Sequence, residues 1–471
     1  MNKNWKLAVS AAAPLFILFL PASWLPLEMT VIEQRILAIF LFACLSWILE
    51  PIPVYATSVL IIVLELVMTS DQSFILFQGG ENDASLGTLL NYKDIMATFA
   101  HPIILLFLGG FFLAMATSKY RLDVNLARII LKPFGSNPRF IMMGLMLITA
   151  LFSMFMSNTA TTAMMFAILT PVLKSFDQND SGRIAVILGI PFAANIGGIG
   201  TPIGTPPNAI ALRYLTGADA IAFGTWMCFA VPYVIVMLFF AWFILLRIFP
   251  MQSKEIHLTI EGKFLTHTKA MILYITFAVT VILWLLGGMH GMNSYVVAMI
   301  PVAVFTVTQV ITAEDLKQIS WDVLWLVAGG FALGLGLEKS GLSTNLINNI
   351  PFSTMSPFLM VLFCTLLCYI VANFMSNTAT ANLLMPIVAV LGASMASLEP
   401  LGGRTMLILA TAMTASLSMA LPVSTPPNAI AYSSGLIQTR HMSIAGITIG
   451  LVGLLGLYLL MFILNTIGFF A

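Results

Sequence analysis

The sequence predicts an all-α polytopic membrane protein with eleven transmembrane helices and two re-entrant hairpins, arranged as an inverted-topology repeat. Three observations lead to this class. The 471 residues are 59% hydrophobic and 8% charged, with a mean hydropathy of +1.00, so most long segments prefer lipid to water. Two polar motifs each occur twice, at a nearly constant spacing, and basic residues gather in alternate loops. The net charge of +1 indicates neither nucleic-acid binding nor a polybasic lipid-binding surface.

Eleven apolar runs are predicted to cross the membrane, since a spanning helix needs about 20 such residues. The first run follows Lys3 and Lys6 but lacks a small-residue cleavage site after it, so we expect an uncleaved span rather than a signal peptide. The expected crossings lie near 7–20, 31–49, 52–69, 99–117, 183–215, 221–249, 270–287, 293–311, 322–337, 404–436 and 442–468.

Two further apolar regions, 138–175 and 355–397, each carry a polar tip between two arms of about 16 to 20 residues. The tips, 155–161 and 374–380, are identical in sequence. We expect re-entrant hairpins that enter and leave on one side; the alternative is two full crossings with Ser-Asn-Thr in an exposed loop. Cytoplasmic loops are enriched in Lys and Arg. Basic residues lie at both ends of the first region, namely Lys119, Arg121, Arg128, Lys132, Arg139, Lys174 and Arg183.

The same charge bias predicts a cytoplasmic N-terminus and an outside C-terminus. The cytoplasmic side would receive Arg247, Lys254, Lys263, Lys269, Lys317 and Arg440. The opposite side would receive the loop 70–94, whose charged residues are Asp71, Glu81, Asp83, Lys93 and Asp94.

One unit of the chain is predicted to be duplicated. Gly109-Gly110-Phe111 recurs at 329–331, an offset of 220, and the Ser-Asn-Thr motif recurs with an offset of 219. We expect an extra N-terminal span in 1–30, a first repeat in 31–250, a cytoplasmic linker in 251–269 and a second repeat in 270–471. Each repeat holds five crossings and one hairpin, so the second must be inverted. Inverted repeats are typical of secondary transporters.

A second duplicated motif predicts a break in two of the spans. Thr205-Pro206-Pro207-Asn208 is answered by the same four residues at 425–428, and 197–202 and 418–422 supply flexible backbone before each break. Proline fits the first turn of a helix but not its interior. A new helix could therefore begin at each Pro-Pro pair, with Thr205 or Thr425 as its cap. Each span would therefore consist of two half-helices.

The two tips and two breaks are expected to meet at one site in mid-membrane. Each tip exposes carbonyl oxygens, which suit a small alkali cation, and N–H groups, which favour a carboxylate. Four half-helix N-termini would balance much of a dianion. No Lys or Arg lies at either tip, and a fixed buried cation would be costly to move. Bound sodium ions could instead arrive and leave with the anion.

Each of these features also has a simpler interpretation. A lone Ser-Asn-Thr is most often a packed helix contact, but two matched tips and two matched breaks argue against packing alone. Glu50, Glu65, Asp322 and His101 lie near span ends, where interfacial or packing roles are expected. An enzyme is disfavoured because no Ser–His, Asp–Asp or His-rich constellation lies in the apolar segments. A channel is disfavoured because the chain carries its own inverted pair.

Together these motifs resemble the divalent anion/sodium symporter family, bacterial members of which are sodium-coupled di- and tricarboxylate transporters. The resemblance covers nearly the whole chain and is carried by Ser-Asn-Thr at 157–159 and 376–378, with Thr-Pro-Pro after each. It implies import of C4-dicarboxylates such as succinate, malate and fumarate with sodium ions across a bacterial inner membrane. Sodium-independent dicarboxylate exchange stays open as the alternative. It also implies a lipid-embedded homodimer with an elevator mechanism, whose mobile part holds the hairpins, the broken spans, 221–249 and 442–468.

The resemblance further implies substrate contacts at Asn158, Thr159, Asn377 and Thr378, and the breaks add Thr205, Pro206, Thr425 and Pro426 as candidate substrate-binding residues. Its first sodium site would be formed by Ser153, Ser157, Asn158 and Gly200. The second would be formed by Ser376, Asn377 and Ala420. The repeats differ here, because Ala372 stands where the first repeat has Ser153, so a carbonyl or Thr380 would have to replace that hydroxyl.

Overall fold

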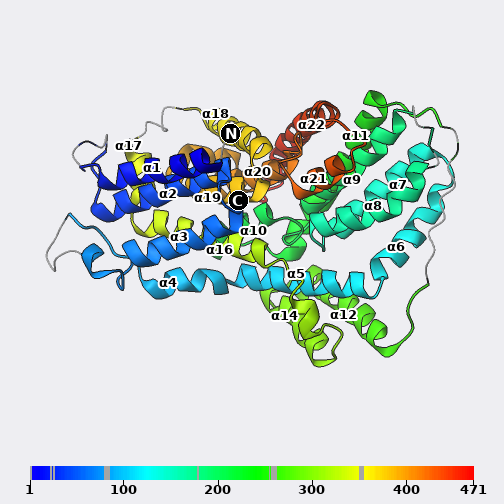
Figure 1. Cartoon of the computed structure of the whole chain (residues 1–471), viewed down its shortest axis with the longest axis horizontal. Coiled ribbons are helices and arrows are strands. Elements are labelled where there is room, and N and C mark those ends of the chain that lie inside the picture. The colour runs from blue at the N-terminus through cyan, green and yellow to red at the C-terminus, as the bar shows by residue number, and fades with distance from the viewer. Residues whose placement is uncertain are drawn as a thin grey trace.

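The computed structural model describes residues 3–21, 24, 27–78, 85–174, 176–177, 180–253, 255, 263–349 and 355–470. Over these residues the chain is helical, with a single β-bridge between Ser70 and Leu90. Figure 1 shows an elongated molecule with α1 (Lys3–Phe19), α2 (Val31–Leu49) and α3 (Val54–Met68) toward one end and α6, α7 and α8 toward the other. Three charged residues used for the topology, Glu81, Asp83 and Lys254, lie outside the described residues, as does most of 254–262 in the predicted linker.

The remaining helices of the predicted first repeat are α4 (Tyr92–Ala97), α5 (Pro102–Lys119), α6 (Leu122–Leu131), α7 (Pro138–Ser153), α8 (Asn158–Lys174), α9 (Gly182–Gly198), α10 (Pro206–Tyr214) and α11 (Phe223–Ile248). Short 3₁₀ helices lie between them at Ile75–Phe77, Thr98–Ala100, Lys132–Phe134 and Gly217–Asp219. Among these helices, α5, α9, α10 and α11 lie in expected spans, whereas α4 and α6 were not predicted.

The second half of the chain repeats this order. Its helices are α12 (Thr268–Leu285), α13 (Gly287–His290), α14 (Ser294–Val307), α15 (Ala313–Leu316), α16 (Trp321–Lys339), α17 (Leu342–Asn349), α18 (Pro357–Phe374), α19 (Asn377–Ser394), α20 (Gly403–Leu417), α21 (Pro426–Ser433) and α22 (Thr439–Thr466), with a 3₁₀ helix at Ala396–Leu401.

Helix boundaries follow local capping chemistry. Helix α2 begins with a capping box, in which the Glu33 N–H donates to Thr30 Oγ1 (3.3 Å) and the Thr30 N–H donates to Glu33 Oε2 (2.7 Å). Helix α7 begins at Pro138 after Asn137, whose side chain accepts the Arg139 N–H at 3.0 Å. Proline at the first position of a helix loses no helical hydrogen bond, so Pro138 fits the start of α7.

Eight helices among the described residues are long and apolar enough to cross a membrane, which confirms the all-α membrane class. They are α2, the run Tyr92–Lys119 that includes α5, α11, α12, α16, α18, α19 and α22. Helices α3, α7, α9 and α14 are apolar but shorter. Both α18 and α19 pass the same length criterion as a full crossing, so eleven crossings with two re-entrant hairpins stays a prediction.

The duplicated Gly-Gly-Phe sequence has the same packing role in both halves. A Cβ at Gly109 of α5 would lie 2.9 Å from the carbonyl carbon of Ala298 in α14. A Cβ at Gly329 of α16 would likewise lie 2.7 Å from the carbonyl oxygen of Ser58 in α3. Glycine therefore lets two helix backbones approach closely, as is common between membrane helices. The pairs α5–α14 and α3–α16 are built alike.

The half-helices that follow the two breaks cross between the halves of the chain. Helix α10 packs against α19 and α20, while α21 packs against α8 and α9. Each half-helix thus contacts the helix pair of the other half, and these contacts bring the two tips and two breaks toward the centre of the molecule (Figure 1).

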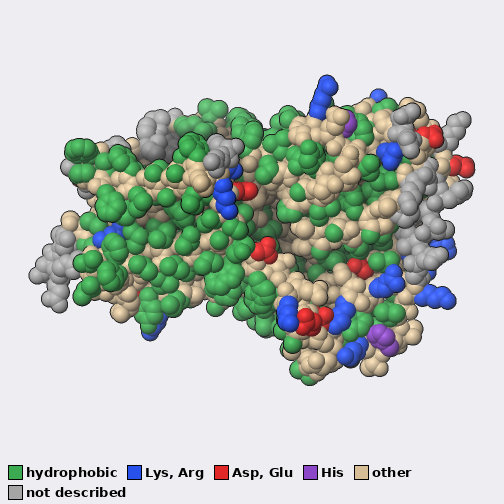
Figure 2. Space-filling view, in the orientation of Figure 1, with side chains coloured by type: hydrophobic (Ala, Val, Ile, Leu, Met, Phe, Trp, Pro, Cys, Tyr) green, Lys and Arg blue, Asp and Glu red, His purple; other side chains and the backbone are tan. Residues whose placement is uncertain are grey.

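A broad apolar surface covers much of the molecule, as Figure 2 shows for one face. Large hydrophobic side chains stay exposed on the longest helices, among them Leu455 (69%) and Phe462 (68%) of α22 and Ile275 (60%) of α12. Exposed apolar surface on this scale fits lipid rather than water. The chain is therefore an integral membrane protein.

Asp180 ties the start of α9 to the chain that follows α11. Its carboxylate accepts hydrogen bonds from the N–H of Gly182 (2.8 Å), the N–H of Ser253 (2.8 Å) and the Ser253 hydroxyl (2.6 Å). Burial opposes ionisation of this carboxyl group, but these hydrogen bonds outweigh it and hold the pKa of Asp180 below its ordinary value.

Replacing this carboxylate should destabilise the protein only while the carboxylate is ionised. A depressed folded-state pKa gives stability that is fully present above the ordinary pKa of about 4 and is lost as pH falls through the folded value. We expect Asp180→Asn to lower the melting temperature in detergent by about 2 °C at neutral pH and by less in acid. Asp177→Asn, an exposed change in the same loop, is the control, and equal shifts for both variants would contradict this role.

Candidate functional site

Both tips and both breaks line one cavity of about 380 Å³. All eight residues predicted to bind substrate lie in its wall: Asn158, Thr159, Thr205, Pro206, Asn377, Thr378, Thr425 and Pro426. The structure thus brings together two pairs of segments that are about 220 residues apart in sequence. That these residues bind substrate stays a prediction.

Four helix N-termini open at this cavity, those of α8, α10, α19 and α21. Side chains cap three of them. Ser157 Oγ accepts the Ala160 N–H (3.2 Å), Ser376 Oγ accepts the Ala379 N–H (3.2 Å), and Thr425 Oγ1 accepts the Asn428 N–H (3.3 Å). The expected cap at Thr205 is wrong, because its side chain makes no such bond in α10. The remaining N–H groups give the cavity a positive potential.

The breaks are held by two buried asparagines at matching positions. Asn208 Nδ2 donates to the carbonyl oxygens of Gly198 (3.0 Å), Ile199 (3.2 Å) and Thr201 (2.8 Å). Asn428 Nδ2 donates to the carbonyl oxygens of Met419 (2.9 Å) and Leu421 (3.0 Å). The Gly198 and Met419 carbonyls have these amides as donors, while Ile199, Thr201 and Leu421 also accept from Trp226 Nε1 (2.9 Å), the Gly204 N–H (3.3 Å) and the Ser424 N–H (3.2 Å). The Asn that ends each Thr-Pro-Pro-Asn motif is therefore a brace for the break before it.

Asn195 of α9 joins the two breaks. Its Nδ2 lies 3.1 Å from Thr425 Oγ1 and 3.3 Å from Asn428 Oδ1, so a side chain from the first half contacts the second break directly. Asn195 lines the cavity and is 1% exposed, and its Oδ1 has no partner among the described residues. Its role could not be predicted from the sequence, because Asn195 stands outside both motifs.

The first predicted sodium site is rich in oxygen. Ser153 Oγ is buried and lies 2.5 Å from Asn158 Oδ1 and 2.8 Å from the carbonyl oxygen of Ala194. One hydroxyl hydrogen can serve only one of these acceptors. The Asn158 amide also packs on Gly198, where a Cβ would lie 2.8 Å from Oδ1. Ser157 lines the adjoining cavity, and Gly200 packs on the Met154 side chain at the same tip.

The second predicted sodium site is built differently. Ser376 and Asn377 line the cavity, and Asn377 Oδ1 is buried without a partner among the described residues. Ala420 is tied to the end of α18 by Asn373, whose Oδ1 accepts the Ala420 N–H at 2.8 Å. The Asn373 carbonyl in turn accepts the Ser424 hydroxyl at 2.9 Å.

Asn373 and Ser424, rather than Thr380, thus link the second tip to its break. Thr380 Oγ1 lies 3.1 Å from the carbonyl oxygen of Ser376 within its own helix. With the offset of 219 residues, Ser153 corresponds to Ala372, but the polar side chain in the second half belongs to Asn373, one residue later. A shift of one residue within a helix end is invisible to such a comparison.

The cavity wall also contains Asp322 and Tyr55, which stand in neither duplicated motif. Asp322 was expected to have an interfacial or packing role, but it is exposed in the wall of the cavity, as is Tyr55 at the start of α3. By contrast Glu65 is fully buried between helices and lies outside the cavity wall.

A second cavity of about 460 Å³ adjoins the first and shares Phe111 and Ser157 with it. Its wall includes Lys119 and Asp315, which form an ion pair at 2.5 Å. Lys119 lies on the side predicted from the basic residues to be cytoplasmic. The shared residues place the second cavity directly beside the first tip.

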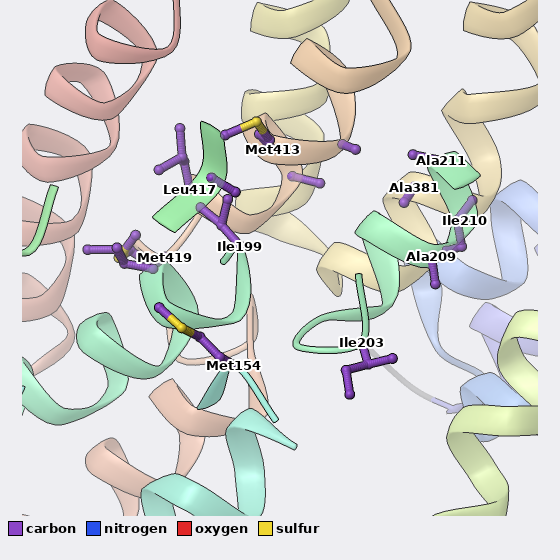
Figure 3. Packing of buried hydrophobic residues seen from close by; sticks show 14 of the residues in the cluster. Met154, Ile199, Ile203, Ala209, Ile210, Ala211, Ala381, Met413, Leu417 and Met419 are labelled. Atoms are coloured by element: carbon purple, nitrogen blue, oxygen red, sulfur yellow. The ribbon is translucent and has the colours of Figure 1, made fainter. Parts of the chain in front are cut away.

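Apolar side chains from both halves pack behind the polar site. Figure 3 shows Met154 and Ile199 of the first half near Leu417 and Met419 of the second. All four are largely buried, at 7% exposure or less. This packing supports the irregular backbone of both breaks from the side away from the cavity.

The fold and the site define a class: an integral membrane protein, helical over the described residues, in which two related helix sets surround one cavity lined by the duplicated polar motifs. A family model described as the sodium:sulfate symporter transmembrane region matches residues 1–467. The chain belongs to this family. The resemblance noted from the motifs is therefore confirmed, and the protein is a transporter rather than an enzyme, with sodium as the co-transported ion.

Curated relatives carry more specific names. The sodium-dependent dicarboxylate transporter SdcS of Staphylococcus saprophyticus is 30% identical over 469 residues, covering 91% of this chain and 85% of that protein. The sodium-dependent high-affinity dicarboxylate transporter 3 of Caenorhabditis elegans is 30% identical over 427 residues, covering 77% and 74%.

Solved structures share the fold at low identity. Neisseria gonorrhoeae MtrF is 12% identical, with a TM-score of 0.50 over 87% of this chain and 94% of that one. The Alcanivorax borkumensis YdaH transporter is 14% identical, with a TM-score of 0.50 over 92% and 98%. These likenesses concern the fold alone.

Replacing the brace of the first break should unfold it locally. In Asn208→Asp a carboxylate oxygen would face the carbonyls of 198, 199 and 201 in place of the donating amide, at a cost of more than about 3 kcal/mol. We expect a clearly lower melting temperature in detergent.

Asn293→Asp is the matched control, because Asn293 is an exposed N-cap of α14 and Asp caps equally well. A melting temperature for Asn208→Asp equal to that of the control would show that the amide is not a brace.

Proposed function

We propose that this protein imports C4-dicarboxylates such as succinate, malate and fumarate together with sodium ions, across the inner membrane of a bacterium. The observation that carries the proposal is the convergence of two Ser-Asn-Thr tips and two Thr-Pro-Pro-Asn breaks on one cavity. Sodium-dependent dicarboxylate transporters among the relatives support the substrate class.

The chemistry of the cavity suits two carboxylates. The amides of Asn158 and Asn377 and the hydroxyls of Thr159 and Thr378 can donate to one carboxylate at each tip. Four helix N-termini add a partial positive charge of roughly half a unit each. No Lys or Arg lines the cavity among the described residues, so the anion would be held by dipoles and neutral donors.

Sodium ions would complete the charge balance. At the first tip a cation would replace the crowding of Ser153 Oγ, Asn158 Oδ1 and the Ala194 carbonyl with favourable contacts to all three oxygens. At the second tip the free Asn377 Oδ1 offers the same kind of ligand. Because Asn158 and Asn377 would contact both a cation and the anion, each ion would strengthen binding of the other.

Movement would follow the elevator scheme. The tips, the breaks, α11 and α22 would move as one body past α2, α3, α5, α12, α14 and α16, with α1 as the added first helix. The cavity lies at the boundary between these sets, since α3, α5 and α16 supply the rest of its wall. The adjoining second cavity supports a state open toward the predicted cytoplasmic side. We further propose re-entrant tips, an inside N-terminus and a homodimer.

The test of this function is uptake of radiolabelled succinate into proteoliposomes of the purified protein. We expect saturable accumulation driven by an inward sodium gradient, and none with potassium in its place. Uptake that requires only internal dicarboxylate would identify an exchanger instead. Uptake of sulfate in preference to succinate would overturn the dicarboxylate assignment.

The tip asparagines should be essential for transport but not for folding. We expect Asn158→Ala and Asn377→Ala each to reduce the initial rate of sodium-driven uptake by about 10- to 100-fold, since each loses a hydrogen bond to a charged ligand. Thr170→Ala on α8 and Ser394→Ala on α19 are controls, because both side chains are exposed and bond only to their own helix.

Elution as a folded species on size exclusion should be unchanged for all four variants. Near-normal uptake by either tip variant would show that the asparagine of that tip has a packing role and does not bind substrate.

A further inference from the structure

The cavity carries one charge, and that charge is negative. Within the described part of the chain, Asp322 is the one charged residue in the cavity wall. The other polar groups there are hydroxyls, amides and helix N-termini, which attract anions. A carboxylate in a site for a carboxylate substrate opposes that attraction and calls for an explanation.

Asp322 lies in the part of the wall without the tips. This part is formed by the start of α3, the middle of α5 and the first turns of α16, and apart from Asp322 its residues are apolar or aromatic. They are Pro53, Val54, Tyr55, Phe107, Phe111, Val323 and Leu326. An anion with two carboxylates can place both at the tips, but a third carboxylate would have to face this wall.

The Asp322 carboxylate has no compensating partner. It is exposed, and no ion pair or hydrogen bond from its side chain is found among the described residues. Lys119, in the wall of the adjoining second cavity, is paired with Asp315. A third negative charge in the cavity would therefore meet an uncompensated carboxylate.

We propose that Asp322 sets the charge of the transported anion, so that the site accepts dianions and rejects trianions. The inference rests on the proposed dicarboxylate function and deepens it. Specificity often depends on a repulsive element as well as attractive contacts, and a like charge without a counter-ion is such an element. Removing it should make a tricarboxylate a much better ligand.

The test is competition against sodium-driven succinate uptake in proteoliposomes at saturating sodium. The competitors are propane-1,2,3-tricarboxylate, fully ionised at about pH 8, and its monoamide, a dianion of nearly the same size. We expect Asp322→Asn to strengthen inhibition by the tricarboxylate about tenfold more than inhibition by the monoamide, as expected for one unit charge near a protein surface.

Asp322→Glu, which keeps the charge, and Asp219→Asn, which neutralises a partly buried carboxylate outside the cavity wall, should leave this ratio at the wild-type value. An acidic residue in the first turn of α16 also favours the helix, but losing that effect would change inhibition by both competitors equally. Asp322→Ser repeats the measurement should the Asn variant fold poorly.

Three results would overturn the inference. They are an unchanged ratio, an equal gain for both competitors, and a loss of sodium dependence in Asp322→Asn, which would make Asp322 a cation ligand. Absence of sodium-driven succinate uptake by the unmodified protein would instead refute the proposed function itself.

Discussion

The whole site depends on supplying hydrogen-bond donors to backbone carbonyls where two helices stop inside the membrane. Lipid cannot supply them, and each unsatisfied group would cost several kcal/mol. Asn208 and Asn428 meet this need with one amide group each, from the fourth position of Thr-Pro-Pro-Asn. The proline that precedes them prevents the helix from continuing, and the asparagine makes the interruption stable. Trp226 and the N–H groups of Gly204 and Ser424 add further donors to the same carbonyl groups.

Stable breaks place helix N-termini where a charged substrate can use them. A site built from dipoles, hydroxyls and amides carries no full positive charge of its own, so it does not hold a buried cation when empty. Its affinity for an anion then depends on ions that come and go, which is a physical basis for coupling. The oxygen cluster around Ser153 at the first tip and the free Asn377 oxygen at the second are where such ions would contribute.

Much of this arrangement could be predicted from sequence because duplication repeats the evidence. One Pro-Pro pair or one Ser-Asn-Thr is ambiguous, whereas identical motifs at 157–159 and 376–378 require a shared cause. The bounds of α5, α11 and α16 follow from hydropathy alone. Asn195, Asn373 and Asp322 could not be found in this way, because their roles arise from which helices pack together. Re-entry of the two tip regions was predicted from flanking charge and stays a prediction, since α18 and α19 are as long and apolar as crossing helices.

The differences between the halves are as informative as the likeness. Ser153 places a hydroxyl between Asn158 and the Ala194 carbonyl, whereas Asn373 uses its amide oxygen to hold the Ala420 N–H. Asn373 is therefore no counterpart of Ser153 as a free oxygen ligand, and the second tip instead offers the unpartnered Asn377 Oδ1. If both tips bind sodium as proposed, entry of a cation at the first would break the hydrogen bond between Ser153 and Asn158, whereas entry at the second would break none at Asn377 Oδ1. An anion that arrives after either ion would meet a cavity that has already gained part of its positive charge.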